Sequence, residues 1–235
     1  HLETLMNAIK LTSIVLVGSA AIAISATSAQ AFSFSVGGTA VAGEGYKSSL
    51  AGAQTIDFNS GSPSNSVVTY SGIVNNIVQG SKSGQHATPA GNESKFLTIS
   101  QKNANVVGNT GSVTLNFAKA LDYFGLYWGS VDTHNFIDFY SGGKLLKTFG
   151  GGDISTTAKG SWTGASDNLY LNFFAGAGQS FDQIVLRANG TAFESDNHSY
   201  RESAAVPEPT TMAGLALASA GFAAARRKKQ KAQAS

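Results

Sequence analysis

The stretches SVTLNF (residues 112–117) and NLYLNF (residues 168–173) decide the fold class of this chain of 235 residues. In both stretches every second residue is apolar. These apolar residues are Val113, Leu115, Phe117, Leu169, Leu171 and Phe173. Because successive side chains of a strand point to opposite faces, this alternation is typical of strands that bury one face.

Short β-rich runs continue on both sides of these stretches. Further strands are expected over 55–58, 67–70, 73–78, 96–100, 123–128, 136–140, 144–149, 181–187 and 191–194. Ser141-Gly142-Gly143 is expected to form a tight hairpin turn, because Gly accepts a positive φ. Gly and Ser are concentrated in 37–65 and 80–94, which we expect to be surface loops.

The pattern predicts an all-β body over residues 32–198, built as an antiparallel β-sandwich or jelly-roll-like domain. Its expected core consists of the six residues above and of Phe124, Leu126, Ile184 and Leu186. Residues 199–206 are expected to form a short linker after the last strand.

Composition excludes several kinds of chemistry. The chain has no Cys, which excludes disulfides, thiolate metal sites and a Cys nucleophile. Residues 32–206 hold ten Lys and Arg against twelve Asp and Glu, so the basic excess lies in the tail. A nucleic-acid partner is therefore not expected for the body.

The N-terminal region reads as an export signal. Lys10 precedes the apolar stretch 11–24, and Ala29-Gln30-Ala31 has the small residues of a cleavage site. We expect a signal peptide region over 1–31, export by the Sec machinery, and cleavage by signal peptidase after Ala31. An uncleaved membrane anchor is the alternative.

The C-terminal region has three parts in a fixed order. Val206-Pro207-Glu208-Pro209 comes first, the uncharged stretch 210–225 follows, and the basic cluster of Arg226, Arg227, Lys228 and Lys229 ends it. As a helix, sixteen residues span about 24 Å of a membrane core about 30 Å thick. A single transmembrane helix is expected here, with the basic cluster on the cytoplasmic side and residues 230–235 as a tail.

These three parts resemble the PEP-CTERM sorting domain, over residues 207–229. The resemblance implies that exosortase processes the chain near Pro207-Glu208-Pro209. It also implies a transient stay in the inner membrane, a final place at the cell surface or outside the cell, and an association with exopolysaccharide and biofilm matrix. An ordinary tail anchor is the alternative.

The body is similar to a family of exosortase-dependent surface proteins. The similarity lies in the segments 121–140, 170–174, 181–186 and 192–197. It implies a location and no enzymatic activity. The β-rich body also looks similar to carbohydrate-binding jelly rolls, at the level of fold alone.

No catalytic residue is expected. The chain has no G-x-S-x-G sequence, and its Ser residues lie mostly in Gly/Ser runs typical of turns. A Ser–His–Asp arrangement stays open, because its members need not be near in sequence. Because no residue is singled out as a nucleophile, a secreted hydrolase is the least favoured function.

Five residues are candidates for binding a sugar ligand. Trp162 lies in a polar run flanked by Gly, so its ring is expected to be exposed and able to cover the apolar face of a sugar. Trp128 is a second candidate, although its alternation with Phe124 and Leu126 favours the core. Asp132, His134 and Asn135 follow in one loop and could supply polar contacts.

Calcium is the metal that the residue types favour, because Asp and Asn oxygens are frequent and thiolates are absent. The candidate ligands are Asp57, Asp122, Asp196 and Asn197. Such an ion would be structural, in an exported domain without disulfides.

These observations predict an exported, exosortase-processed and non-catalytic protein of the cell surface or extracellular matrix. A carbohydrate-binding β-sandwich module is the alternative, and it could equally describe how a matrix component works.

Overall fold

The computed structural model describes residues 31–204, except 104 and 158, together with six residues of the tail: 219, 220, 222, 223, 226 and 230. The strands are β1 (Ser33–Val36), β2 (Thr39–Val41), β3 (Gly45–Lys47), β4 (Gln54–Ile56), β5 (Val68–Ser71), β6 (Ile77–Val78), β7 (Phe96–Ser100), β8 (Ser112–Gly129), β9 (Asn135–Ser141), β10 (Lys144–Gly150), β11 (Leu169–Phe174), β12 (Phe181–Ala188) and β13 (Thr191–Glu202). A single helical turn, α1 (Gly151–Ile154), follows β10. All strand pairs are antiparallel, which confirms the all-β prediction.

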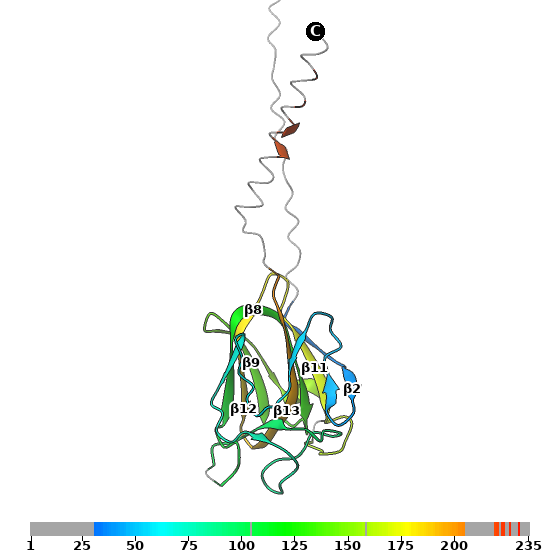
Figure 1. The fold of residues 1–235 in the computed structure, drawn as a ribbon, viewed down its shortest axis with the longest axis vertical. Coiled ribbons are helices and arrows are strands. Elements are labelled where there is room, and N and C mark those ends of the chain that lie inside the picture. Colours follow the sequence, from blue (N-terminus) through cyan, green and yellow to red (C-terminus); the bar gives the residue numbers. More distant parts are fainter. Residues whose placement is uncertain are drawn as a thin grey trace, which may run out of the picture.

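The long strand β8 joins the two layers of the sandwich. Its first part, up to Phe117, pairs with β12 and β5, and its second part, from Leu121, pairs with β11 and β13. Between them, Ala118–Ala120 stay extended and exposed while the strand bends over the top of the molecule (Figure 1). One layer therefore runs β10-β9-β12-β8-β5, and the other runs β1-β11-β8-β13 with β4, β7 and β6 beyond.

Aromatic rings fill the space between the two layers. Phe139 of β9 lies 5.2 Å from Phe173 of β11 and 6.4 Å from Phe124 of β8, measured between ring centroids. Nine of the ten expected core residues are buried, and Leu169 is partly buried against the same cluster. The prediction of one core is confirmed.

The hairpin expected at Ser141-Gly142-Gly143 is present. Gly142 and Gly143 both have positive φ, and Lys144 pairs with Ser141 across the turn. Most expected strands lie within two residues of their observed bounds.

Four expectations about local structure were wrong. The separate strands 112–117 and 123–128 form one strand, because no Gly or Pro interrupts Ala118–Ala120. The expected loop 37–65 contains β2 and β3 in addition to the strand expected at 55–58, which is β4, and in 73–78 only Ile77–Val78 is a strand. The last strand continues to Glu202, since Ser199–Glu202 pair with β8, so the linker begins only after it.

Both ends of the body leave the sandwich at the same pole. Leu121, at the bend of β8, pairs with Glu202 near the end of β13 and with Phe181 at the start of β12. The ring of Phe32 lies 5.7 Å from that of Phe181 and 4.7 Å from that of Phe139. Figure 1 shows the two ends of the body side by side beside the bend.

The expected signal peptide lies outside the described residues except for Ala31, and so does most of the expected transmembrane segment 210–225. Among the residues that the structure describes, no helix is long and apolar enough to cross a membrane.

Candidate functional site

A small polar pocket lies at the pole opposite the chain ends. Gly129, the last residue of β8, pairs there with Glu194 of β13, far along both strands from the pairing of Leu121 with Glu202. The pocket has a volume of about 170 Å³. The lining side chains used below are His86, Ser130, Asp132, Trp162 and Glu194, and we call this site the Trp162 pocket.

A loop held by two buried side chains presents Trp162. The carboxylate of Asp167 accepts hydrogen bonds from the backbone N–H groups of Lys159 (3.2 Å) and Ser161 (2.8 Å). The amide of Asn168 donates to the carbonyls of Ser161 (2.9 Å) and Gly164 (3.0 Å). The loop is therefore fixed on both sides of Trp162, whose side chain keeps 49% of its surface exposed.

Glu194 forms the floor of the pocket. It is 2% exposed, and its two oxygens accept hydrogen bonds from the backbone N–H of Ala87 (2.8 Å) and from the hydroxyl of Ser130 (2.7 Å). Burial raises the pKa of Glu194 to about 7, and the nearby carboxylate of Asp132 adds to the rise. The pocket therefore holds a carboxyl group that changes charge near neutral pH.

Asp132 and His134 form a pair beside this floor. The Nε2 of His134 lies 2.9 Å from the Oδ2 of Asp132, and the His134 backbone N–H donates to Oδ1 at 3.1 Å. Burial raises the pKa of Asp132 to about 6, although the His134 charge acts against the rise. Gly190 packs against the His134 ring so closely that a Cβ there would lie 2.3 Å from it. The residue at 190 therefore has to be Gly for the ring to keep this place.

His86 brings an unused nitrogen to the pocket. Burial lowers the pKa of His86, and the charge of Lys82 lowers it further. Its Nδ1 is buried and has no hydrogen-bond partner among the described residues. The neutral ring can therefore still accept or donate one hydrogen bond there.

Four of the five sugar-binding candidates come together at this site. Trp162 and Asp132 line the pocket, and His134 contacts Asp132. Asn135 donates from Nδ2 to the carbonyl of Ala192 in the pocket wall (2.9 Å). The fifth candidate, Trp128, is fully buried and stacks on Phe193 at 4.4 Å, as its alternation favoured.

Sequence reasoning missed Glu194, Ser130 and His86. Glu194 reaches the pocket only because β13 pairs with the end of β8, a contact between residues 65 positions apart. In the sequence, Glu194 is only a charged residue at the end of the expected strand 191–194, and such a residue is typical of many exposed positions as well.

A second hollow of about 440 Å³ adjoins the other side of the Trp162 loop. Thr163 and Ala165 of that loop line it, opposite Tyr46. The ring of Tyr46 is 39% exposed and lies 5.4 Å from the ring of Tyr127. The Oδ1 of Asn168 connects the walls of the two hollows. It accepts a hydrogen bond from the backbone N–H of Ser130 (3.3 Å), which lines the Trp162 pocket, and from that of Ala90 (2.9 Å), which lines the second hollow.

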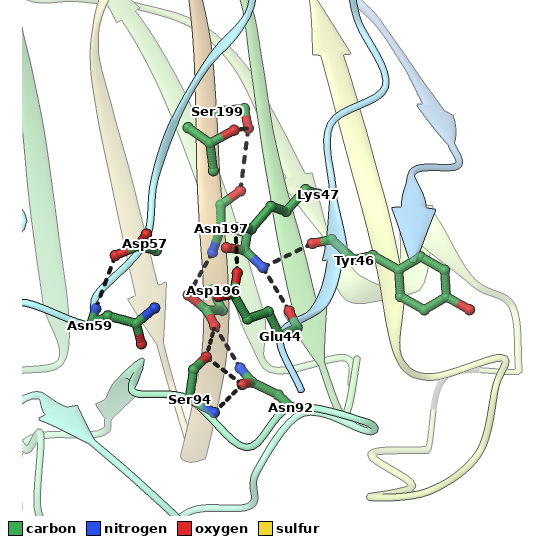
Figure 2. Close-up of polar contacts among 11 residues, drawn as sticks. Glu44, Tyr46, Lys47, Asp57, Asn59, Asn92, Ser94, Asp196, Asn197 and Ser199 are labelled. Atoms are coloured by element: carbon green, nitrogen blue, oxygen red, sulfur yellow. Dashed lines mark hydrogen bonds and ion pairs between the residues drawn. The ribbon is translucent and has the colours of Figure 1, made fainter. Parts of the chain in front are cut away.

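Three of the four calcium candidates lie close together. Figure 2 shows Asp57, Asp196 and Asn197 beside one another, with Asn92 and Ser94 at the edge of the group. The carboxylate of Asp196 accepts from Asn197 N (2.7 Å), Asn92 Nδ2 (2.6 Å) and Ser94 Oγ (3.1 Å). Burial raises the pKa of Asp196 to about 6, and the Asp57 carboxylate adds to the rise.

The fourth candidate, Asp122, lies apart from the other three. Its carboxylate is paired with Arg201, whose Nε donates to Oδ1 at 2.9 Å and whose second nitrogen donates to Oδ2 at 3.2 Å. Within the described part of the chain, no group of three or more His, Asp, Glu or Cys residues is placed to hold a metal ion.

The described residues also contain one contact of the kind found in serine hydrolases. The Oγ of Ser195 lies 2.9 Å from Nε2 of His198, and Nδ1 of His198 lies 2.8 Å from the hydroxyl of Tyr70. Ser195 and His198 are both fully buried, and burial lowers the pKa of His198 to about 3. This group is a hydrogen-bonded part of the core and has no solvent-exposed surface at Ser195 or His198.

Residues near the C-terminus carry a known sorting motif. The family model of the PEP-CTERM protein-sorting motif matches residues 205–228. The predicted sorting domain is thereby confirmed, and the chain is an exported protein with a membrane-anchored sorting signal that targets it to exosortase. No curated protein matches the chain.

Proposed function

We propose that the processed body is a non-catalytic component of the cell surface or extracellular matrix that binds exopolysaccharide of the biofilm through the Trp162 pocket. The observation that carries this proposal is a half-exposed Trp ring fixed beside buried polar acceptors. A sugar needs both features, because its C–H face packs on an aromatic ring while its hydroxyls need fixed partners.

The pocket is built before a ligand arrives. Asp167 and Asn168 hold the loop of Trp162, while Ala87 and Ser130 hold Glu194. Side chains that are already ordered lose little conformational freedom on binding, so a weak set of contacts yields more net affinity. At about 170 Å³ the pocket is smaller than the ~300–1,000 Å³ clefts of drug-sized ligands and suits one sugar unit.

The adjoining hollow favours a polymer as the ligand. Tyr46 offers a second exposed ring on the far side of the Trp162 loop. A sugar chain that places one unit in the Trp162 pocket can therefore continue across the loop onto Tyr46.

The arrangement of the chain ends supports a surface role. Both ends of the body leave beside the bend of β8 (Figure 1). The Trp162 pocket lies at the other end of that strand, because Glu194 of its lining pairs with Gly129. A signal peptide and a sorting motif at the two ends would therefore hold the bend of β8 toward the membrane. The pocket would face away from the membrane while the chain is anchored there.

A secreted hydrolase is the alternative that the pocket has to be tested against, since two carboxyl groups lie in it. Both oxygens of Glu194 are already engaged by Ala87 and Ser130, which suits a structural acceptor better than a group that exchanges protons with a substrate. Release of new reducing ends from a bound glycan would favour the hydrolase.

A glycan array probed with the mature exported protein tests the proposal. We expect binding to a limited set of polysaccharides and at least tenfold weaker binding by Trp162→Ala, because the variant loses the sugar platform. Leu145→Ala is the matched control, since Leu145 is also exposed but lies on β10 beside Tyr140. Unchanged binding by Trp162→Ala, or no binding to any glycan by the parent, would overturn the proposal.

A further inference from the structure

We propose that the unit bound in the Trp162 pocket is an amino sugar with a free, protonated amine, as in a partly de-N-acetylated polysaccharide. This inference rests on the proposed function and names the ligand class of the same site.

One of the two carboxyl groups of the pocket has no cationic partner in the described structure: Asp132 pairs with His134 at 2.9 Å, whereas Glu194 accepts hydrogen bonds only from the neutral groups of Ala87 and Ser130. Asp132 and Glu194 both line the pocket, and each carboxylate disfavours the charge of the other. Of the residues described as lining this pocket, none is Lys or Arg. A ligand that carries a positive charge would supply the missing partner and let both carboxyl groups ionise.

His86 adds an independent reason for a hydrogen-bond donor. The residue is more than nine-tenths buried, it lines the pocket, and its Nδ1 has no hydrogen-bond partner in the described structure. Because burial keeps the ring neutral, Nδ1 can accept an N–H from the ligand. An ammonium group has three N–H donors, and Asp132, Glu194 and His86 are residues of the pocket lining that carry hydrogen-bond acceptors.

Trp162 fits the same ligand. A sugar ring lying on the indole brings its amine close to the aromatic face, where a cation is attracted by the ring. A metal ion is a less suitable cation for this pocket than a protonated amine, since the described residues hold no group of three acidic or His ligands placed for a metal.

The two carboxyl groups of the pocket also disfavour negatively charged sugars as ligands. A uronic acid or a sulfated sugar would bring a negative charge to two carboxyl groups, and an N-acetylated sugar would bring none. The pocket should therefore distinguish an amine from its acetylated form, although the two sugars differ by only one group.

Calorimetric titration of the mature exported protein at about pH 6 tests the inference, because the amine of a glucosamine unit is flanked by electron-withdrawing C–O bonds, is a weaker base than a Lys side chain, and is mostly protonated only below neutral pH. The probes are hexamers of glucosamine, of N-acetylglucosamine and of galacturonic acid. We expect the glucosamine hexamer to bind at least tenfold more tightly than its acetylated form, and the galacturonic acid hexamer not to bind. Glu194→Gln should reduce the preference for the amine, and Asp132→Asn serves the same purpose should the first variant fail to fold.

Asp182→Asn is the control, because it removes the same charge from an exposed carboxylate that contacts the β9–β10 turn. A preference that falls equally in the control would mean non-specific attraction and would overturn the inference. Equal or tighter binding of the acetylated hexamer would also overturn it and leave the proposed function intact. Absence of binding to every glycan in the array would instead remove the proposed function.

Discussion

At the scale of single residues, Glu194 makes the stability of the body depend on pH. Its pKa is about 7 in the folded protein against 4.5 in an unfolded chain, so the folded state binds the proton more tightly. The stabilisation is present below about pH 4.5 and is lost as the pH rises through 7. The difference corresponds to roughly 3 kcal/mol at most.

Glu194→Gln should remove this dependence, since the amide keeps its shape and never ionises. Urea unfolding at about pH 5 and pH 8 measures the free energy of unfolding, and we expect the variant to gain relative to the parent at the higher pH by roughly 1–3 kcal/mol. Asp182→Asn should show no such gain. An equal difference between parent and Glu194→Gln at both pH values would show that Glu194 is not buried as described.

Calcium binding stays a prediction at the same scale, now for Asp57, Asp196 and Asn197, which lie together. Asp57 and Asp196 repel each other, and the Oδ1 of Asn197 is buried without a hydrogen-bond partner in the described structure. If an ion binds them, calcium should raise the melting temperature of the parent and not that of Asp57→Asn. Calorimetric melting with calcium and with a chelator decides this, and Asp122→Asn is the control because Asp122 pairs with Arg201 instead. A parent insensitive to calcium would end the prediction.

At the scale of elements, a substitution in β11 tests whether the two layers share one core. Leu171 is fully buried and lies between Val36 of β1 and Leu126 of β8. Leu171→Ala should cost roughly 2–5 kcal/mol and lower the melting temperature by roughly 5–15 °C, because it leaves a cavity in the shared core. Thermal unfolding followed by circular dichroism measures this. Thr69→Ala on the exposed face of β5 should leave the melting temperature nearly unchanged, and a parent-like value for Leu171→Ala would contradict the single core.

The elements also show what sequence can and cannot predict. Alternation located the strands of the core, since Val113, Leu115 and Leu171 follow the period that a half-buried strand imposes. It could not locate β2, β3 or the bend of β8, because these depend on pairing and packing between distant segments. The Gly-flanked run of Trp162 indicated an exposed ring, whereas the role of Glu194 depends on the pairing of β13 with β8.

At the scale of the whole molecule, the sorting motif follows the last strand closely in the sequence. Four residues separate Glu202, the last residue of β13, from Pro207. Replacing Pro207-Glu208-Pro209 by three Ala residues should leave unprocessed protein in the inner membrane, because the motif that exosortase reads is gone. Cell fractionation with mass spectrometry of both chain ends measures this, and the parent should begin at Phe32. Normal processing of the variant, or of the parent in a host without exosortase, would contradict the prediction.

The central claim is that the exported body binds its polysaccharide at Trp162. The fluorescence of the two Trp residues measures this binding directly. Trp128 is buried in the core while Trp162 is half exposed, so an aqueous quencher such as acrylamide reaches mainly Trp162. Adding the exopolysaccharide of the producing cells should shift the emission to shorter wavelength and protect it from the quencher, and Trp162→Phe should abolish both changes. Emission and quenching that stay unchanged at saturating polysaccharide, or that change equally in Trp162→Phe, would contradict the claim.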